Sequence, residues 1–417
     1  MRKIHSILIG LAVTLALAPP ARAEQKYTLG FTSDFLGGIG NQSGSGGSNA
    51  GRVLTGTPPF FALYPSLTLK AVGAHSNFNI AYGFTMDHYW SDPEALTTTY
   101  HALTLNLDTR IGRRTSLKFS NSLRNTPDVS MLNVLKGFVF TPDGFQSIYE
   151  PMLFKNHSYS ELSRLSMDVE VTRKSFLTFA VDGTIRRYGN IAVDETWTFQ
   201  DQTRIGGTIS YSRKSGKRGS FGVNYKIYQN DYRDYGPTRS HALQFHASRE
   251  LAPSLMFTFE AGPSLTEKNQ YLPEDRISIN FSASLSKKLN TSLLSMHFSK
   301  SSGDSSGMGY ARDSYQAGLG FSRPFGPRTS LNVDVSAFQQ KGQSFYNQDK
   351  QVPAYDYWGL SGSAVLSRKL SRLWTLSFGG NYQDFKGQKA VSMNHMSYKR
   401  LYVSLSFQLP ELWRAAR

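Results

Sequence analysis

The 417-residue chain contains no cysteine. Disulfides, thiolate metal sites and the lipid-modified cysteine of a lipoprotein are therefore excluded. Long hydrophobic runs are also missing, since no segment after residue 23 approaches the roughly 18 uninterrupted apolar residues that a membrane-spanning helix needs. The mean hydropathy is -0.37, and helical periodicity is almost absent. Neither covalent cross-links nor a bundle of membrane helices can hold this chain together.

The first residues have the features of a leader. Two basic residues follow the initiator methionine, residues 7–18 form a short apolar run, and a Pro-Pro pair ends it. Ala21-Arg22-Ala23 then places small residues at the two positions that a signal peptidase reads. We predict a signal peptide over residues 1–23, export through the general secretory pathway, and one mature domain over residues 24–417.

Acidic residues are the scarcer charge, with 30 Asp and Glu against 46 Lys and Arg. Removal of the predicted leader leaves 43 basic residues. A basic excess can indicate nucleic acid, but export and the lack of a basic helix or an aromatic RNA-binding motif argue against that partner. The acidic partners that remain are lipopolysaccharide phosphates, anionic phospholipid headgroups, and an anionic solute or glycan in a pore. A generally basic surface explains many single charges equally well.

What the sequence does contain is a period of two. In residues 276–286, RISINFSASLS, apolar side chains occupy every odd position and polar side chains every even one. The same alternation recurs in residues 221–228, 331–337 and 400–407. Successive residues of a strand point to opposite faces, so each segment has one apolar and one polar side. These segments run about 10 to 15 residues, whereas strands of soluble proteins are usually nearer 5 or 6.

About eighteen such segments can be counted, with sixteen as the alternative. Bacterial outer-membrane barrels have an even number of strands in this range. The segments begin near Gln25, Phe61, Ser76, Thr98, Thr115, His157, Ser175, Trp197, Ser220, Thr238, Ser254, Arg276, Thr291, Asp313, Arg328, Ala354, Arg372 and His395.

The connections alternate between short and long. Short basic breaks such as SRPFGPRTSL at residues 322–331 recur at Ser212, Ser248, Ser286 and Ser367. Longer joins lie between them, including residues 34–60, 125–156 and 340–353. We predict an all-β, closed, antiparallel transmembrane β-barrel with short periplasmic turns and long extracellular loops. Closure is required because lipid offers no hydrogen bonds to a free sheet edge. The soluble rival, a large sandwich or β-helix, would have shorter strands and loops of similar length at both ends.

With this architecture the sequence resembles the outer-membrane β-barrel porin superfamily, in particular its large and diverse set of β-barrel porins. The resemblance covers residues 25–409 and rests on architecture, not on a residue motif. It implies an outer-membrane location in a Gram-negative cell and contact with the barrel-assembly machinery. Such barrels finish on an alternating strand with a terminal aromatic residue. Residues 402–407 fit that pattern, but QLPELWRAAR follows them.

If the apolar faces meet lipid, the polar faces line the interior. The modest basic excess among the pore-lining candidates suggests a mild anion preference, although opposite charges that only brace each other would give the same composition. The basic candidates are Lys70, Arg110, Lys118, Arg124, Arg164, Arg186, Arg204, Lys226, Arg276 and Arg400; the acidic ones are Asp87, Asp108, Asp168, Glu170, Asp182, Glu260 and Asp334.

The join over residues 125–156 is more apolar than an exposed loop should be. General porins fold the corresponding loop into the pore, and the resemblance implies the same for residues 131–140. An extracellular cap or a contact between subunits is the alternative. The constriction candidates are Met131, Leu132, Leu135, Phe138 and Phe140.

Two further features belong to the rims. The join over residues 34–60 contains GGIGNQSGSGGSNAG and is predicted to be a mobile outer loop. Aromatic residues gather near strand ends, where their rings suit the bilayer interfaces; a sugar-binding track is the alternative. They are Tyr355, Tyr357, Trp358, Trp374, Tyr382, Tyr398 and Tyr402.

The sequence offers little for catalysis. His246 and Ser248 form an H-x-S pair that would face the interior, His241 would face the opposite side, and no cluster has metal-ligand spacing. We predict no enzyme activity, no catalytic residue, no metal and no cofactor. The predicted function is a porin-like channel for passive passage of hydrophilic solutes. A conduit for exopolysaccharide export is the alternative, and a structural or lipid-modifying barrel is a remote one. The oligomeric state stays open.

Overall fold

The structure is a computed structural model. It describes residues 26–45, 59–89, 98–126, 139–141, 144–146, 158–188, 192–194, 197–198, 201–216, 218–232, 236–268, 274–304, 311–342, 345–347, 350–352, 355–387 and 395–416. The predicted leader over residues 1–23 and most of the predicted constriction segment, including Met131, Leu132, Leu135 and Phe138, lie outside these ranges; Phe140 lies in a short strand whose side chains are not described.

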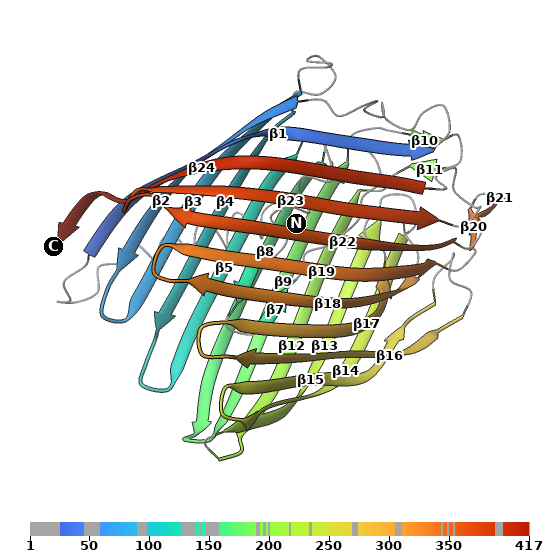
Figure 1. The fold of residues 1–417 in the computed structure, drawn as a ribbon. Coiled ribbons are helices and arrows are strands. Elements are labelled where there is room, and N and C mark those ends of the chain that lie inside the picture. Colours follow the sequence, from blue (N-terminus) through green and yellow to red (C-terminus); the bar gives the residue numbers. More distant parts are fainter. Residues whose placement is uncertain are drawn as a thin grey trace.

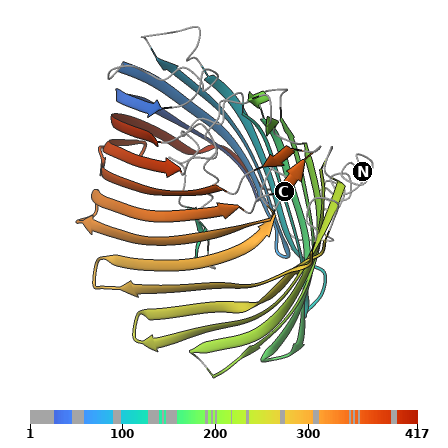
Figure 2. The ribbon, with the colours of Figure 1, turned by 90° about the vertical axis from the view of Figure 1, so that its right-hand side faces the viewer.

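Eighteen strands form one antiparallel sheet that closes on itself. Each strand pairs with the next barrel strand along the chain, and β1 (Lys26–Ser45) pairs with β24 (His395–Ala416) to complete the ring. Figure 1 shows the long strands side by side, and Figure 2 shows how they curve around a common axis. The predicted all-β closed barrel of eighteen strands is therefore confirmed. No helix in the described ranges is long and apolar enough to cross a membrane.

The strands run from 12 to 22 residues, as the long alternating segments predict. Three short two-strand ribbons stand apart from the barrel: β6 (Val139–Thr141) with β7 (Gly144–Gln146), β10 (Ala192–Asp194) with β11 (Trp197–Thr198), and β20 (Phe345–Asn347) with β21 (Lys350–Val352). The other barrel strands are β2 (Pro59–Val72), β3 (Ser76–Tyr89), β4 (Thr98–Arg110), β5 (Thr115–Thr126), β8 (Ser158–Thr172), β9 (Ser175–Tyr188), β12 (Gln202–Lys214), β13 (Gly219–Tyr232), β14 (Gly236–Ala252), β15 (Leu255–Thr266), β16 (Arg276–Lys288), β17 (Leu293–Asp304), β18 (Ala311–Phe325), β19 (Thr329–Gly342), β22 (Tyr355–Lys369) and β23 (Trp374–Gly387).

The two rims differ as predicted. At one rim, the short-turn rim, neighbouring strands are joined by two to four residues; the segment SRPFGPRTSL makes one of these turns, between β18 and β19. Gly326 has a φ of 75° there, a left-handed conformation that glycine adopts without strain. At the other, the long-loop rim, the joins are mostly longer. The predicted strand starts agree with the structure except at Trp197, which lies in β11, because the barrel strand β12 begins at Gln202.

One further expectation, about the first strand, is wrong, and the last strand extends past the alternating segment that ends at Phe407. The glycine-rich segment after Asp34 is not loop as far as Ser45, since β1 stays paired with β24 up to the pair Ser45–His395. The tail QLPELWRAAR does not leave the barrel after Phe407, because β24 continues to Ala416 opposite Lys26. Two extra residues of β24 bulge out beside Gly30, where Pro410 has no N–H to give to the ladder. Pairing across the β1–β24 seam alone holds these segments in strands, since the β1–β2 ladder ends at Ile39 and the β23–β24 ladder at Phe407, and it overrides their weak strand propensity.

Two prolines interrupt single seams elsewhere without shifting the register. Pro65 in β2 and Pro263 in β15 lack the N–H that a central strand needs, and each neighbouring ladder skips two residues and resumes in the same register. At the second site Gly262 lies so near β14 that a Cβ would overlap the carbonyl oxygen of Leu243. Glycine is required at this position because the backbones of the two strands approach closely there.

Substitution of Gly262 by alanine should destabilise the barrel by about 1 to 3 kcal/mol, the usual cost of forcing extra atoms into a packed site. Gly207→Ala is the matched control, because its Cβ would meet nothing closer than 3.6 Å. Heat-modifiable mobility in gel electrophoresis, followed against temperature, measures both. If G262A and G207A have the same midpoint temperature of unfolding, β14 and β15 can move apart to admit the added methyl group without loss of stability.

Candidate functional site in the barrel interior

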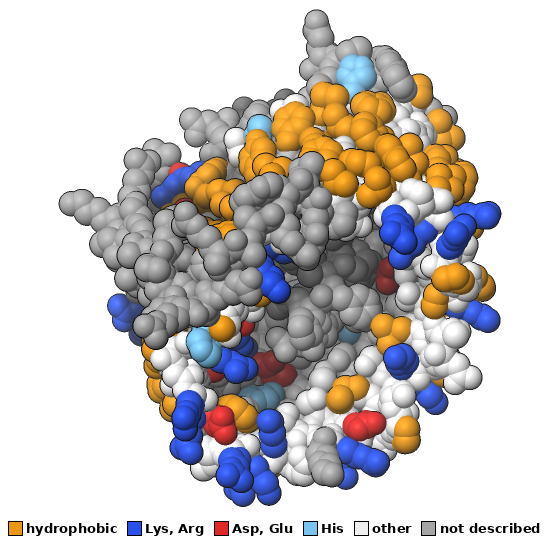
Figure 3. All heavy atoms as spheres, turned by 90° about the vertical axis from the view of Figure 1, so that its left-hand side faces the viewer, with side chains coloured by type: hydrophobic (Ala, Val, Ile, Leu, Met, Phe, Trp, Pro, Cys, Tyr) orange, Lys and Arg blue, Asp and Glu red, His pale blue; other side chains and the backbone are white. Residues whose placement is uncertain are grey.

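The two faces of the wall differ in chemistry. Apolar side chains on one face are widely exposed, including Val181 (54%), Ile209 (52%) and Leu319 (55%). The alternate residues of the same strands are Ser, Thr, Asn and charged residues, and they face the inside of the ring. Figure 3 looks into the hollow of the barrel, where acidic and basic side chains are visible within the wall. The interior is therefore the candidate site.

Strand register places the predicted pore-lining residues on this inner face. Asp87 lies in β3, but its side chain is not among those described. On β4 and β5 the outward apolar residues include the buried cluster of Leu105, Leu107 and Phe119. The other predicted residues alternate with the outward apolar residues of their own strands: Lys70, Asp108, Arg110, Lys118, Arg124, Arg164, Asp168, Glu170, Asp182, Arg186, Arg204, Lys226, Glu260, Arg276, Asp334 and Arg400.

Charge concentrates on one side of the interior. The Lys118 ammonium nitrogen lies 2.8 Å from an Asp168 carboxylate oxygen, and the Thr178 hydroxyl donates to the other oxygen at 2.7 Å. Arg164 stands opposite Asp182 in the β8–β9 register. We call this surface the charged wall; it consists of Lys118, Arg164, Asp168, Asp182, Arg186 and Arg204, on β5, β8, β9 and β12.

Arg204 is held by an aromatic ring. Its guanidinium carbon lies 4.1 Å from the centroid of the Tyr228 ring on β13. Stacking orients an arginine without neutralising it, because the ring offers a quadrupole and no formal charge. Four basic groups therefore face two carboxylates on the charged wall, and its net charge is positive.

A second charged group lies further round the ring. Lys226 on β13 reaches across β14 to Glu260 on β15, with 3.0 Å between Nζ and Oε1. The amide of Asn224 donates to the same oxygen at 3.3 Å. His246 lies in register with Glu260, on the inner face as expected, whereas His241 lies on the outer one. The opposite charges of Lys226 and Glu260 compensate each other, so this pair adds little to the electrostatic potential of the lumen.

Near the closing seam an arginine serves a packing role. Arg400 is 1% exposed, and its guanidinium carbon lies 3.4 Å above the centroid of the Phe60 ring. Tyr402 also faces inward and lies over Gly379, where any Cβ would overlap its ring. The expectation that Tyr402 belongs to an interfacial girdle is therefore wrong. Trp358, Trp374 and Tyr382 lie on the outer face; the side chains of Tyr355, Tyr357 and Tyr398 are not described.

The side opposite the charged wall is rich in hydroxyl groups. The hydroxyl oxygens of Ser336 and Ser361 are 2.6 Å apart, and those of Ser367 and Ser377 are 2.8 Å apart. Asp334 lies on β19 opposite Ser363; it has no hydrogen-bond or ion-pair partner among the described side chains. We call this surface the hydroxyl wall; it comprises the inward residues Ser336, Ser361, Ser363, Ser367, Ser377 and Ser404, on β19, β22, β23 and β24. Sequence reasoning did not single these serines out, because serine alone has no distinctive spacing.

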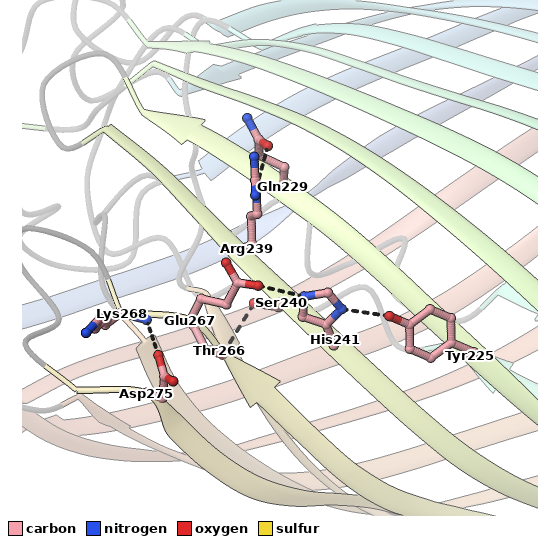
Figure 4. A network of polar contacts seen from close by, with 9 residues as sticks. All are labelled: Tyr225, Gln229, Arg239, Ser240, His241, Thr266, Glu267, Lys268 and Asp275. Atoms are coloured by element: carbon pink, nitrogen blue, oxygen red, sulfur yellow. Dashed lines mark hydrogen bonds and ion pairs between the residues drawn. The ribbon is translucent and has the colours of Figure 1, made fainter.

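The outer face becomes polar toward the long-loop rim. On β14, His241 Nδ1 lies 2.7 Å from the Tyr225 hydroxyl, and its Nε2 lies 2.9 Å from Glu267. Arg239 donates to Gln229 at 3.1 Å beside them. Figure 4 shows these side chains as a band of polar contacts across β13–β15. The apolar belt of the barrel ends here.

A row of lysines and aromatic rings marks the same border on the other strands. Lys300, Tyr315, Gln339, Trp358 and Lys386 are register partners in succession on β17, β18, β19, β22 and β23. The ammonium groups at the two ends lie 5.7 Å and 5.2 Å from the ring centroids of their aromatic partners. Lys399 stands similarly over Tyr382, at 5.7 Å. We call these residues, with Lys399 and Tyr382, the lysine–aromatic border.

The described part of the chain contains no group of three or more His, Asp or Glu side chains that could hold a metal ion. The H-x-S pair shows no hydrogen bond between His246 and Ser248 among the described contacts, and Ser248 instead contacts Met256 at 3.5 Å. The arrangement of the interior is suited to contacting polar solutes with fixed charges and hydroxyl groups.

No protein-family model matches the chain, and no curated protein matches it. Several solved barrels of Pseudomonas aeruginosa align over most of it. OpdO has 13% identity over 93% of this chain and 98% of its own, with a TM-score of 0.48; OccK2 (OpdF) has 12% over 92% and 98%, also with 0.48. OpdQ has 10% over 93% and 98%, with 0.46. Likeness at this level carries no argument about function, and the fold rests on the strand pairings described above.

Replacement of Arg400 by alanine should lower barrel stability by about 2 kcal/mol, since it removes both the packing of the arginine stem and the stack on Phe60. Arg204→Ala is the matched control, because this arginine also stacks on a ring but is only half-buried. Thermal unfolding monitored by circular dichroism compares them. A larger loss in R204A than in R400A would contradict the packing role.

Proposed function

We propose that this protein is an outer-membrane channel for passive passage of small hydrophilic solutes, with a mild preference for anions. The observation that carries the proposal is the pairing of a closed ladder with a polar, charged inner face. A filled protein core could not satisfy so many inward polar groups, whereas water can. The apolar outer belt, in turn, matches a bilayer and not an aqueous surface.

The anion preference follows from the uneven distribution of charge. The Lys226–Glu260 pair and the Lys118–Asp168 pair compensate themselves. What remains on the charged wall is a surplus of arginine, and in a narrow lumen such a surplus raises the local concentration of anions. The preference should be mild because mobile ions screen charges beyond roughly 8 to 10 Å at physiological salt.

The two walls favour solutes that combine a negative charge with hydroxyl groups. Arginines present paired donors for a carboxylate, and the serines of the hydroxyl wall both donate and accept. Short side chains there also keep that half of the lumen open. A small hydroxylated acid could therefore meet partners on both sides as it passes.

Passage and charge preference can be tested separately. Liposomes that contain the folded barrel should swell in solutions of small neutral sugars and progressively less as sugar size increases. In planar bilayers with a salt gradient, the sign of the reversal potential should show that anions pass more readily than cations. A folded barrel with neither swelling nor conductance would rule out the channel, while cation preference would reject only the second half of the proposal.

Arg204→Gln should shift that reversal potential toward cation preference, because it removes one of the surplus charges. Arg213→Gln is its control on the same strand: Arg213 points to the outer face, so its loss should leave the potential unchanged. Equal shifts in both variants would mean that bulk surface charge, not the charged wall, sets the selectivity.

The lysine–aromatic border indicates how the barrel is oriented in the membrane and which lipid it contacts. Ammonium groups beside interfacial rings suit the phosphate level of a membrane, so we infer that the long-loop rim faces outward, against lipopolysaccharide. The combined substitution Lys300→Gln, Lys386→Gln and Lys399→Gln should weaken the stabilisation of the barrel by added lipopolysaccharide, measured as the shift in its unfolding temperature.

The control for this experiment removes three lysines at the short-turn rim, Lys287, Lys288 and Lys369, by the same change to glutamine. Its shift with lipopolysaccharide should match that of the unmodified protein. If the control loses the stabilisation and the border variant keeps it, the inferred sidedness is reversed.

A further inference from the structure

One seam of the barrel is only half closed. The ladder between β16 and β17 runs from the pair Lys288–Leu293 up to Phe281–Lys300 and stops there. Both strands continue toward the long-loop rim: residues 276–280 stay paired with β15, and residues 301–304 stay paired with β18. The gap is therefore not a frayed end, because each strand is held in place by its other neighbour.

Side chains bridge this seam where the main chain does not. The backbone N–H of Ser302 donates to the side-chain oxygen of Asn280 at 2.6 Å, and the Ser278 hydroxyl donates to that of Ser302, also at 2.6 Å. Had the ladder continued in register, Ile279 would stand opposite Ser302. Instead, polar side chains of β16 reach into the space between the two strands.

An ion pair closes the upper part of the seam. Arg276 Nη2 lies 2.8 Å from a carboxylate oxygen of Asp313 on β18, and both side chains are mostly buried, with 15% and 21% of their surface exposed. Ser302 bonds to the other oxygen of Asp313. The second terminal nitrogen of Arg276, Nη1, is buried without a hydrogen-bond partner in the described structure. Arg276 thus has one terminal nitrogen paired with a carboxylate and one buried without a partner.

The open part of the seam begins at Lys300, in the lysine–aromatic border, and extends from there toward the long-loop rim. It therefore lies outside the hydrocarbon, where water can satisfy backbone groups that have no ladder partner. On its outer lip, by contrast, Ile277 is 77% exposed and Ile279 is 61% exposed. Ile277 is the most exposed large apolar side chain of the described residues. A polar seam that contains an unpartnered guanidinium nitrogen thus lies beside a bare apolar surface. We call the space between the two strands, which polar side chains bridge, the slot.

We propose that the β16–β17 seam is a lateral binding site for a single-chain amphiphile with an anionic head. The head enters the slot and takes the free Nη1 donor of Arg276, while the alkyl chain lies along Ile277 and Ile279 toward the membrane. Asp313 keeps its bond to Nη2 of the same arginine, and Lys300, next to the seam, adds positive charge that favours the head. This site goes beyond the proposed solute passage and does not depend on conductance.

Because the chain has no cysteine, the seam can be locked without background thiols. The paired change Ser278→Cys with Ser302→Cys replaces two hydroxyls that already touch. The matched control is Ser336→Cys with Ser361→Cys, whose hydroxyls are equally close, 2.6 Å apart, within the intact ladder of β19 and β22. Heat-modifiable mobility verifies that each oxidised barrel is folded.

The probes are dodecanoate, dodecyl phosphate and dodecyltrimethylammonium, with binding counted by native mass spectrometry on the detergent-solubilised protein. At least one of the two anions should bind more tightly than the cation, and the comparison of the two tells a carboxylate head from a phosphate head. Arg276→Gln should weaken anion binding about tenfold, the loss expected for one charge-assisted hydrogen bond. Oxidation of the 278/302 pair should abolish it, and reduction should restore it.

Binding that survives the locked seam, or that is equal for anion and cation, overturns the proposal. So does equal loss in the oxidised 336/361 control, since that would report a general effect of cross-linking. Hydrogen exchange gives a measurement that needs no ligand: the amides of residues 277–280 should exchange faster than those of residues 338–341 in the intact seam. Equal protection of the two segments would show that the slot does not hold water.

Discussion

Every feature of this protein depends on the satisfaction of backbone hydrogen bonds in a medium that supplies none. A sheet of eighteen strands with apolar outer faces has only one way to avoid free edges, which is to pair its first strand with its last. The β1–β24 seam performs that closure. It also explains why glycines and a proline that would normally end a strand remain in one. Local propensity loses to pairing because an unpaired edge costs more than a poor strand residue does.

Closure of the sheet gives the wall an inner and an outer face. The residues on each face then determine what that face can contact. Successive side chains of a strand point to opposite faces. A sequence that alternates apolar and polar residues therefore places most of its polar side chains on the inner face of the barrel. The interior then divides by strand: arginine and lysine gather on β5 to β13, and serine on β19 to β24. The difference between the two walls is a property of the strand order, not of any motif, and it gives the lumen one side rich in arginine and lysine and another rich in hydroxyl groups.

The sequence predicts the number of strands, most of their starts, and which residues share the inner face, because all three follow from periodicity and turn composition. It does not predict which charges meet. Lys226 and Glu260 are separated by an intervening strand, and Asp313 pairs with Arg276 only because β16 leaves its neighbour. Such contacts depend on the strand register and on local departures from it. The alternation of apolar and polar residues in the sequence carries no information about either. The burial of Arg400 under Phe60 is similar, since it requires the two ends of the barrel to be brought together.

The β1–β24 seam has a consequence for how the barrel forms. Its nineteen paired positions join residues that are 350 to 390 positions apart in the chain, from Ser45–His395 to Lys26–Ala416, whereas every other barrel seam joins barrel strands that follow one another. Hairpins can therefore assemble early and locally, but the ring cannot shut until the last strand has been made. Loop-closure entropy makes this the slowest contact to gain. Until it forms, the growing sheet has two unprotected edges, and the lifetime of that open intermediate sets the risk of aggregation.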